Sequence, residues 1–197
     1  MDPASATAIR DYVSGGGTVL MTAFSAKVNE HGQWFSTPLP GLLTDVFGMK
    51  TNAFYDIESA LKFDLEGQEI QTNVHLYEVL EPSTATSISR FTSVPDHSPA
   101  LTMNKFGKGN AFYLGTISAP SIMGPVLNYL YKVTGVQPGP ITPEGVYARV
   151  IDGRTLYVNT TQQEKTLPID GQKRGIISNR VYDRLLVLGP FEADLIP

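Results

Sequence analysis

Residues 11–24 read DYVSGGGTVLMTAF, and the three glycines separate two segments of different pattern. The segment before the glycines predicts a helix, because Asp2 and Pro3 suit the N-cap and the first helical position, while Gly15–Gly17 suit the end. Apolar side chains recur in it at helical spacing: Ala4, Ala8, Ile9, Tyr12 and Val13. The apolar run over residues 18–24 predicts a buried, parallel strand. A helix that leads into such a strand indicates α/β organisation.

The elements that follow continue this pattern and then change period. Residues 25–39 are polar and predict a long loop, after which a short helix ends at Gly48 and a strand covers residues 49–57. The short helix has one apolar face: Leu42, Leu43, Val46 and Phe47. From residue 60 the hydrophobic period is two, which predicts strands over 61–65, 74–80, 86–91, 100–104 and 111–116, with a tight turn at 107–109.

A third helix is expected after residue 116. Its apolar face consists of Ile122, Val126, Leu127, Leu130 and Val133. Pro125 is expected in or near the first turn, where proline is tolerated best, and Gly135 follows the end of the helix.

The clearest boundary in the chain is the proline-rich segment QPGPITP at residues 137–143, which predicts a stiff linker. We therefore expect one domain over residues 1–136 and a small antiparallel β-domain over 144–197. In the second domain, Asp152 and Gly153 predict a hairpin turn. Strand residues expected to point inward are Val146, Ala148, Val150, Leu156 and Val158. Further strands are expected over 167–169, 176–178, 185–188 and 193–196.

Composition narrows the classes of protein to which the chain can belong. It has 197 residues and a net charge of −4, whereas a nucleic-acid protein would show a basic patch. It has no cysteine, which excludes a disulfide framework, a thiolate zinc site and a cysteine nucleophile, and which fits a reducing, cytoplasmic compartment. The N-terminus lacks the pattern of a signal peptide. The uncharged stretch 111–131 contains several glycines and prolines, so we expect no membrane span and no membrane partner.

Length excludes one catalytic architecture. A (β/α)8 barrel typically takes about 250 residues, so we do not expect this chain to hold a whole barrel.

No catalytic constellation is apparent among the residues. The glycine run precedes a strand instead of a helix, which argues against a phosphate loop, and Ser25 lacks the nucleophile-elbow pattern. The three histidines (His31, His75 and His97) lie far apart, so no metal or other cofactor is expected. The carboxylates of the strand-rich region flank turns or alternate with apolar residues, as solvated faces do: Glu58, Asp64, Glu66, Glu69, Glu78 and Glu81.

The aromatic pair Trp34–Phe35, inside the long loop, is the one candidate binding feature. Such pairs anchor protein interfaces or stack on a sugar ring. The equally weighted alternative is a loop that folds its aromatic side chains back over its own domain.

Several segments together resemble the non-catalytic C-terminal part of glycoside hydrolase family 42 β-galactosidases. The segments are DYVSGGGTVLMT (11–22), the loop VNEHG (28–32) with LPGLLTDVFG (39–48), SPALTMNKFGKGNAFYLGT (98–116), and LYVNTT (156–161). They occur in the family's order along nearly the whole chain. The chain departs from the pattern at Asn29, where aspartate is usual, and at Ser36–Pro38, where glycines are common.

The resemblance implies a fold and a place in a larger enzyme. It implies a class I glutamine-amidotransferase-like mixed sheet flanked by helices, acting as a trimerisation domain, followed by a small antiparallel all-β domain. The family's catalytic glutamates lie on an N-terminal (β/α)8 barrel, so no catalytic residue is carried over, and amidotransferase activity is excluded because its nucleophile is a cysteine. The family's first strand of this domain would precede residue 1.

The leading hypothesis is therefore an inactive fragment of a retaining β-galactosidase. It would assemble as a homotrimer in the full enzyme, whose absent barrel binds the galactoside. The alternative is a stand-alone accessory module that binds a sugar or a partner through Trp34 and Phe35 and has no enzymatic activity.

Overall fold

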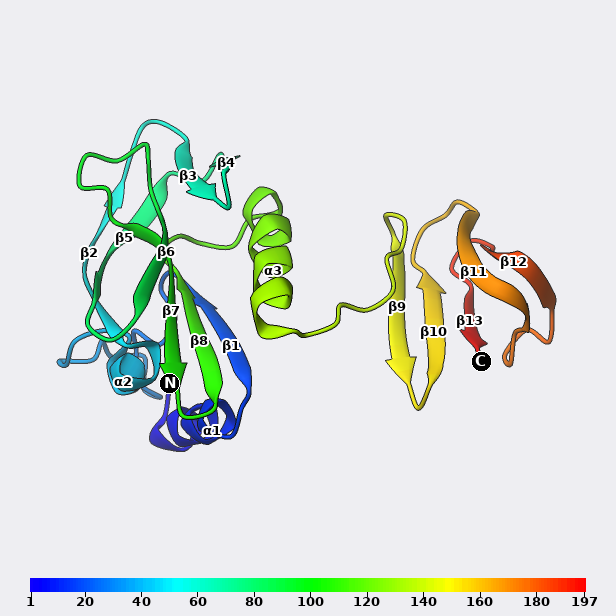
Figure 1. Ribbon diagram of the computed structural model, residues 1–197, viewed down its shortest axis with the longest axis horizontal. Coiled ribbons are helices and arrows are strands. Elements are labelled where there is room, and N and C mark those ends of the chain that lie inside the picture. The colour runs from blue at the N-terminus through cyan, green and yellow to red at the C-terminus, as the bar shows by residue number, and fades with distance from the viewer. The chain divides into compact units, whose positions relative to one another are not determined.

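A four-stranded mixed sheet organises the first part of the chain, with strand order β1-β8-β7-β6 (Figure 1). The strands are β1 (Thr18–Thr22), β8 (Gly109–Leu114), β7 (Pro99–Phe106) and β6 (Thr86–Arg90). β1 runs parallel to β8, as predicted, and the other two pairings are antiparallel. The computed structural model describes residues 1–197. These residues form two compact units, Met1–Val136 and Gln137–Pro197.

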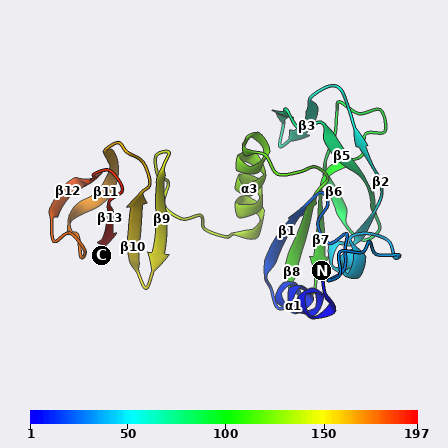
Figure 2. The ribbon, with the colours of Figure 1, turned by 180° about the vertical axis from the view of Figure 1, so that it is seen from behind.

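Helices cover both faces of this sheet. Along β8, Ala111 and Tyr113 join the core beneath α1 (Pro3–Ser14) and α2 (Thr44–Phe47), while Phe112 and Leu114 join the core beneath α3 (Pro120–Thr134). Because successive side chains of a strand point to opposite faces, the first unit has three layers. Figure 2 shows the same arrangement from behind.

Local signals fix the ends of α1 as predicted. The Asp2 carboxylate accepts a hydrogen bond from the backbone N–H of Ser5 at 2.8 Å, and the helix ends at Gly15. The buried face differs from the prediction, because Ala6 and Val13 are buried while Ala4, Ala8 and Tyr12 are exposed. The prediction for the next strand is also partly wrong: β1 is only half-buried, since it is the edge strand of the sheet.

The second strand of the predicted α/β series does not join the main sheet. β2 (Met49–Asp56) pairs antiparallel with β5 (Leu76–Pro82) in a separate two-stranded sheet. The burial of β2 alternates over its first four residues, which is typical of an antiparallel strand with one solvated face. β3 (Leu61–Leu65) pairs with β4 (Gln68–Thr72), a strand that was not predicted because its side chains are mostly polar.

The third helix forms, with two corrections. Ile122, Val126 and Leu130 are buried as predicted, whereas Val133 is exposed. Pro125 lies inside the helix instead of its first turn, because α3 already begins at Pro120. The short second helix starts with a 3₁₀ turn, η1 (Gly41–Leu43), and ends at Gly48 in the left-handed conformation.

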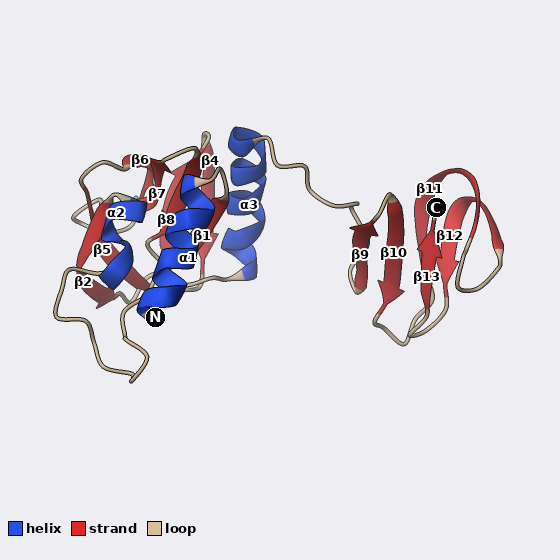
Figure 3. Ribbon diagram, turned by 90° about the horizontal axis from the view of Figure 1, so that it is seen from below, coloured by secondary structure: helices blue, strands red, loops and turns tan.

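The second unit contains only strands (Figure 3). β9 (Val146–Ile151), β10 (Arg154–Asn159) and β13 (Ala193–Ile196) form one sheet in the order β13-β10-β9, and β11 (Lys165–Arg174) pairs with β12 (Val181–Leu188). All pairings are antiparallel. The predicted turn is present, with positive φ at Asp152 and Gly153.

The inward face of this second unit was assigned wrongly along β10. Tyr157 and Asn159 are buried, whereas Leu156 and Val158 are half-buried and Val150 on β9 is exposed. Both faces of β10 carry apolar side chains, so alternation alone did not identify the inner one. Residues 176–178 form a turn instead of the predicted strand.

Candidate interaction site

The site is built where β1 ends. After Thr22 the chain turns sharply, with positive φ at Phe24 (67°) and Ala26 (54°), a conformation that non-glycine residues rarely adopt. The turn is held by hydrogen bonds from Ala23 N–H to the Thr116 carbonyl and from Ser25 N–H to the Thr22 carbonyl. Ligand-binding residues gather at the carboxyl ends of parallel strands in α/β sheets, and this turn has that position.

An ion pair is buried directly behind the turn. Lys27 Nζ lies 2.5 Å from Glu78 Oε1, and these side chains are only 6% and 0% exposed. The Tyr113 hydroxyl donates to Glu78 Oε2 at 2.7 Å. Burial, and then the charge of Glu78 and the hydrogen bond to it, raise the pKa of the Tyr113 hydroxyl well above its ordinary value. Tyr113 therefore stays a neutral donor that completes the pairing of Glu78.

Three aromatic rings surround the ammonium group of Lys27. Its Nζ lies 3.9 Å from the ring centroid of Phe24, 5.0 Å from that of Phe54 and 5.3 Å from that of Trp34. Phe24 and Phe54 also pack edge to face, 5.2 Å apart. A cation within about 6 Å of an aromatic ring is attracted to its face, so Lys27 holds the three rings together.

The predicted aromatic pair separates into one exposed and one covered residue. Trp34 is 58% exposed, and its backbone forms an isolated antiparallel β-bridge with that of Val28. Phe35 is half-buried: its N–H donates to the Lys27 carbonyl at 3.1 Å, and its ring lies against the backbone of Gly41. Only Trp34 of the two is presented to solvent.

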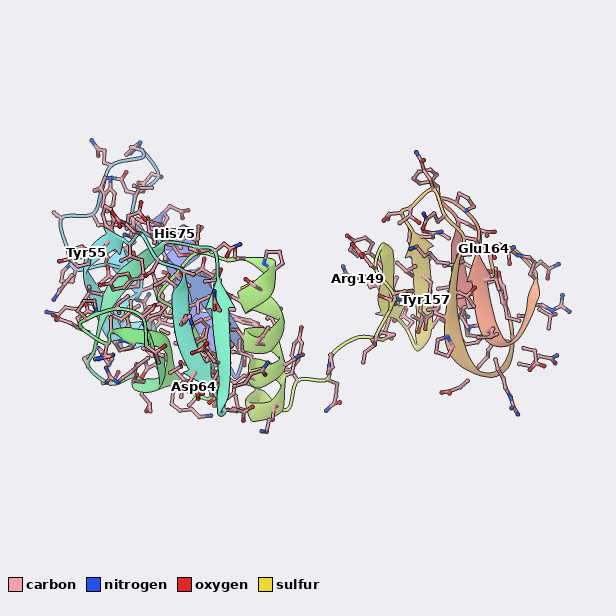
Figure 4. The ribbon with its side chains drawn as sticks, turned by 90° about the horizontal axis from the view of Figure 1, so that it is seen from above. Tyr55, Asp64, His75, Arg149, Tyr157 and Glu164 are labelled. Atoms are coloured by element: carbon pink, nitrogen blue, oxygen red, sulfur yellow. The ribbon has the colours of Figure 1, made fainter.

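Two further exposed aromatic side chains stand on opposite faces of β2. Phe54 and Tyr55 are 50% and 52% exposed, and the Tyr55 ring packs 5.8 Å from Tyr77. Tyr55 lies on the side of the first unit away from α3 (Figure 4). We call the exposed residues Trp34 and Phe54, with Phe24 beneath them, the aromatic patch. Tyr55 is not part of it, because successive side chains of a strand point to opposite faces. Burial, with the nearby Asp96, raises the pKa of Tyr77 to about 12, so it remains neutral.

The structure separates the other candidates of the sequence. The three histidines are exposed and distant in the chain, and no group of three or more histidine or carboxylate side chains is placed to hold a metal. Glu78 contradicts the expectation of a solvated face, because it is fully buried. No local sequence signal indicates this burial, since the partners of Glu78, Lys27 and Tyr113, belong to other elements.

A groove of about 560 Å³ lies beside β1, in the first unit. Its lining includes Tyr12 from α1, Leu20 from β1, Lys108 from the β7–β8 turn, and Tyr131 and Val136 at the end of α3.

None of the helices is long and apolar enough to cross a membrane.

Comparison with known proteins gives one family. The family model described as "Beta-galactosidase trimerisation domain" matches residues 1–137. Beta-galactosidase LacA of Lactobacillus acidophilus is 28% identical over 168 residues, and Beta-galactosidase BgaA of Planococcus sp. is 29% identical over 196 residues. These matches cover 81% and 93% of this chain but only 25% and 29% of the relatives. The chain thus spans between a quarter and a third of the length of these relatives.

Solved structures show the same fold. The β-galactosidase from Bacillus circulans sp. alkalophilus superposes with a TM-score of 0.82 at 22% identity, over 100% of this chain and 31% of that one. The β-galactosidase from the haloarchaeon Halorubrum lacusprofundi gives a TM-score of 0.79 at 22% identity, over 100% and 29%.

Proposed function

The chain belongs to the β-galactosidase trimerisation-domain family, and from this premise we propose that it is the non-catalytic, self-associating region of a β-galactosidase. The observation that carries the proposal is the family match over residues 1–137. The proposed role is to hold copies of the enzyme together as a homotrimer.

The chemistry is proposed to lie outside these 197 residues. We assign the hydrolysis of terminal β-D-galactosides, by a retaining mechanism with two glutamates, to a (β/α)8 barrel of the longer protein, which also binds the substrate. A retaining mechanism needs two carboxylates about 5–5.5 Å apart with access to a sugar. Glu78 does not meet this requirement, because it is buried and already bound to Lys27 and Tyr113. This supports the placement of the chemistry outside these residues. The chain alone is therefore proposed to be inactive. We also propose a cytoplasmic location, because the lack of cysteine fits a reducing compartment.

We propose residues 1–136 as the trimerisation domain, 137–143 as a linker and 144–197 as the small β-domain. The absence of helix or strand over 137–143 supports these bounds. The finer fold proposed for the first domain is the amidotransferase-like sheet, with one more strand in the longer protein. β1 is the edge strand of the sheet, and the groove beside it exposes the side chains of Tyr12 and Val136. An additional strand at this edge would cover these apolar side chains, which supports the proposal. In a right-handed β-α-β crossover, the strand before α1 would lie next to β1.

Two measurements on the purified chain test this function. Light scattering should give the mass of a trimer, and a chromogenic β-galactoside should not be hydrolysed. A chain that stays monomeric at every concentration would contradict self-association, and clear turnover would contradict the placement of the chemistry.

The exposure of Trp34 favours one second candidate, an accessory module that binds a sugar or a partner through Trp34 and Phe35. Trp34 is the only tryptophan, so its fluorescence reports on binding. A saturable shift with millimolar lactose would support sugar binding, and an unchanged spectrum would exclude it at this loop.

A further inference from the structure

The aromatic patch has the composition of a protein interface. Trp34 and Phe54 are each at least half exposed, and aromatic residues are enriched at protein interfaces. The patch is thus a surface that would be stabilised by being covered.

The patch is also pre-organised. The buried Lys27–Glu78 pair, with the aromatic rings around Lys27, fixes the loop that carries Trp34. Burying an ion pair carries a desolvation penalty, which is offset only by good geometry. A surface held in one conformation before binding loses less entropy on binding, so the arrangement suits a docking surface.

Exposed acidic groups lie in the segments that carry the patch. Asp56 and Glu58 follow Tyr55, are exposed and form no ion pair, and Glu30 lies in the same loop as Trp34 with only His31 nearby, at 3.8 Å. A partner surface that complements this rim would be basic.

A matching basic surface lies at the opposite end of β1. Lys105 and Lys108 flank the β7–β8 turn, are exposed and form no ion pair. The Lys108 N–H donates to the Ser14 carbonyl at 3.0 Å, which places the turn beside the start of β1, whereas the patch lies beyond its end. Two different surfaces are what a heterologous, ring-forming contact requires, because a trimer cannot be built from a self-complementary patch.

We infer that copies of this chain meet head to tail, with the aromatic patch and acidic rim of one copy against the Lys105–Lys108 turn of the next. This inference rests on the proposed self-association and specifies the surfaces that perform it.

Trp34 provides a direct test. In a dilution series followed by light scattering, formation of the trimer should shift the Trp34 emission to shorter wavelength and reduce its quenching by acrylamide. A trimer in which Trp34 is as quenchable as in the monomer would overturn the inference and leave the proposed function standing. A chain that never associates would overturn both.

Charge reversal gives a second, independent test at exposed positions. Lys105→Glu with Lys108→Glu, or Asp56→Lys with Glu58→Lys, should each weaken association about tenfold or more, and the four changes together should restore it. Phe54→Ser should weaken it similarly, while Tyr147→Ser, at an exposed aromatic of the second unit, is the matched control. Unchanged association in the reversed pairs, or no recovery in the combined variant, would contradict the head-to-tail contact.

Discussion

Lys27 Nζ and Glu78 Oε1 lie 2.5 Å apart, with both side chains almost wholly removed from solvent. The pair joins the loop after β1 to β5, and through Tyr113 it also joins β8. These contacts hold the base of the aromatic patch. The stability of this part of the first unit should therefore depend on both charges together.

Glu78→Gln should destabilise the first unit by about 3–5 kcal/mol, because it leaves the Lys27 ammonium buried without its countercharge. Urea unfolding followed by Trp34 fluorescence measures the change. The matched control is Glu81→Gln, which breaks an exposed pair with Lys50 and should cost less than about 1 kcal/mol. Adding Lys27→Met to Glu78→Gln should recover part of the loss. Equal effects of the two single variants would contradict a buried pair.

Tyr113→Phe should cost about 1–3 kcal/mol, because it removes the hydroxyl donor to Glu78 from a buried site. Tyr157→Phe is the control: Tyr157 is also buried, and its hydroxyl makes no hydrogen bond within the chain. Urea unfolding followed by circular dichroism compares the two. An equal or larger loss for Tyr157→Phe would contradict the hydrogen bond to Glu78 as the cause of the effect.

Elements with local signals could be predicted from the sequence. The start of α1 follows from Asp2 and Pro3, and the end of α2 follows from Gly48, because each cap is made within a few residues. The apolar run of β1 identified a parallel strand. Trp34 is exposed and Phe35 is half-buried, and their role in binding stays a prediction.

Long-range features could not be predicted. Glu78 and Tyr113 are 35 residues apart, so nothing near Glu78 distinguishes a buried carboxylate from a solvated one. Phe54 joins Trp34 only because β2 pairs with β5 outside the main sheet. The inner face of β10 was ambiguous because Leu156 and Tyr157 are both large and apolar, and only packing against β12 selects Tyr157.

Gly48→Ala should destabilise the first unit more than the left-handed conformation alone would. A Cβ at this position would clash with Thr84 Oγ1 and with the side chain of Asn104. Gly67→Ala is the control, since Gly67 also has positive φ but has open space around its Cβ. The control should cost about 1–2 kcal/mol, and Gly48→Ala about 1–3 kcal/mol more, in thermal or urea unfolding. Equal losses would show that the close contact relaxes without cost.

The stability of the second unit should depend on the charge of Asp194. Burial by itself raises the pKa of this carboxyl, but hydrogen bonds from the hydroxyls of Ser178 and Tyr182 and from the N–H groups of Ile177 and Ser178 leave the pKa below its ordinary value. A group with a lowered folded pKa stabilises the fold above its unfolded pKa, and this contribution is lost as the pH falls through the folded pKa.

Unfolding of the second unit, followed by the NMR amide signals of β10 and β13, should therefore become easier as the pH falls below about 4. Asp194→Asn should lower stability by roughly 2 kcal/mol at pH 7, because an amide is a weaker acceptor than a buried carboxylate. The difference between the two proteins should shrink toward pH 2, where Asp194 gains a proton and the other carboxyls titrate equally in both proteins. A difference that is the same at pH 7 and pH 2 would show that the ionised form of Asp194 gives the fold no advantage over the neutral one.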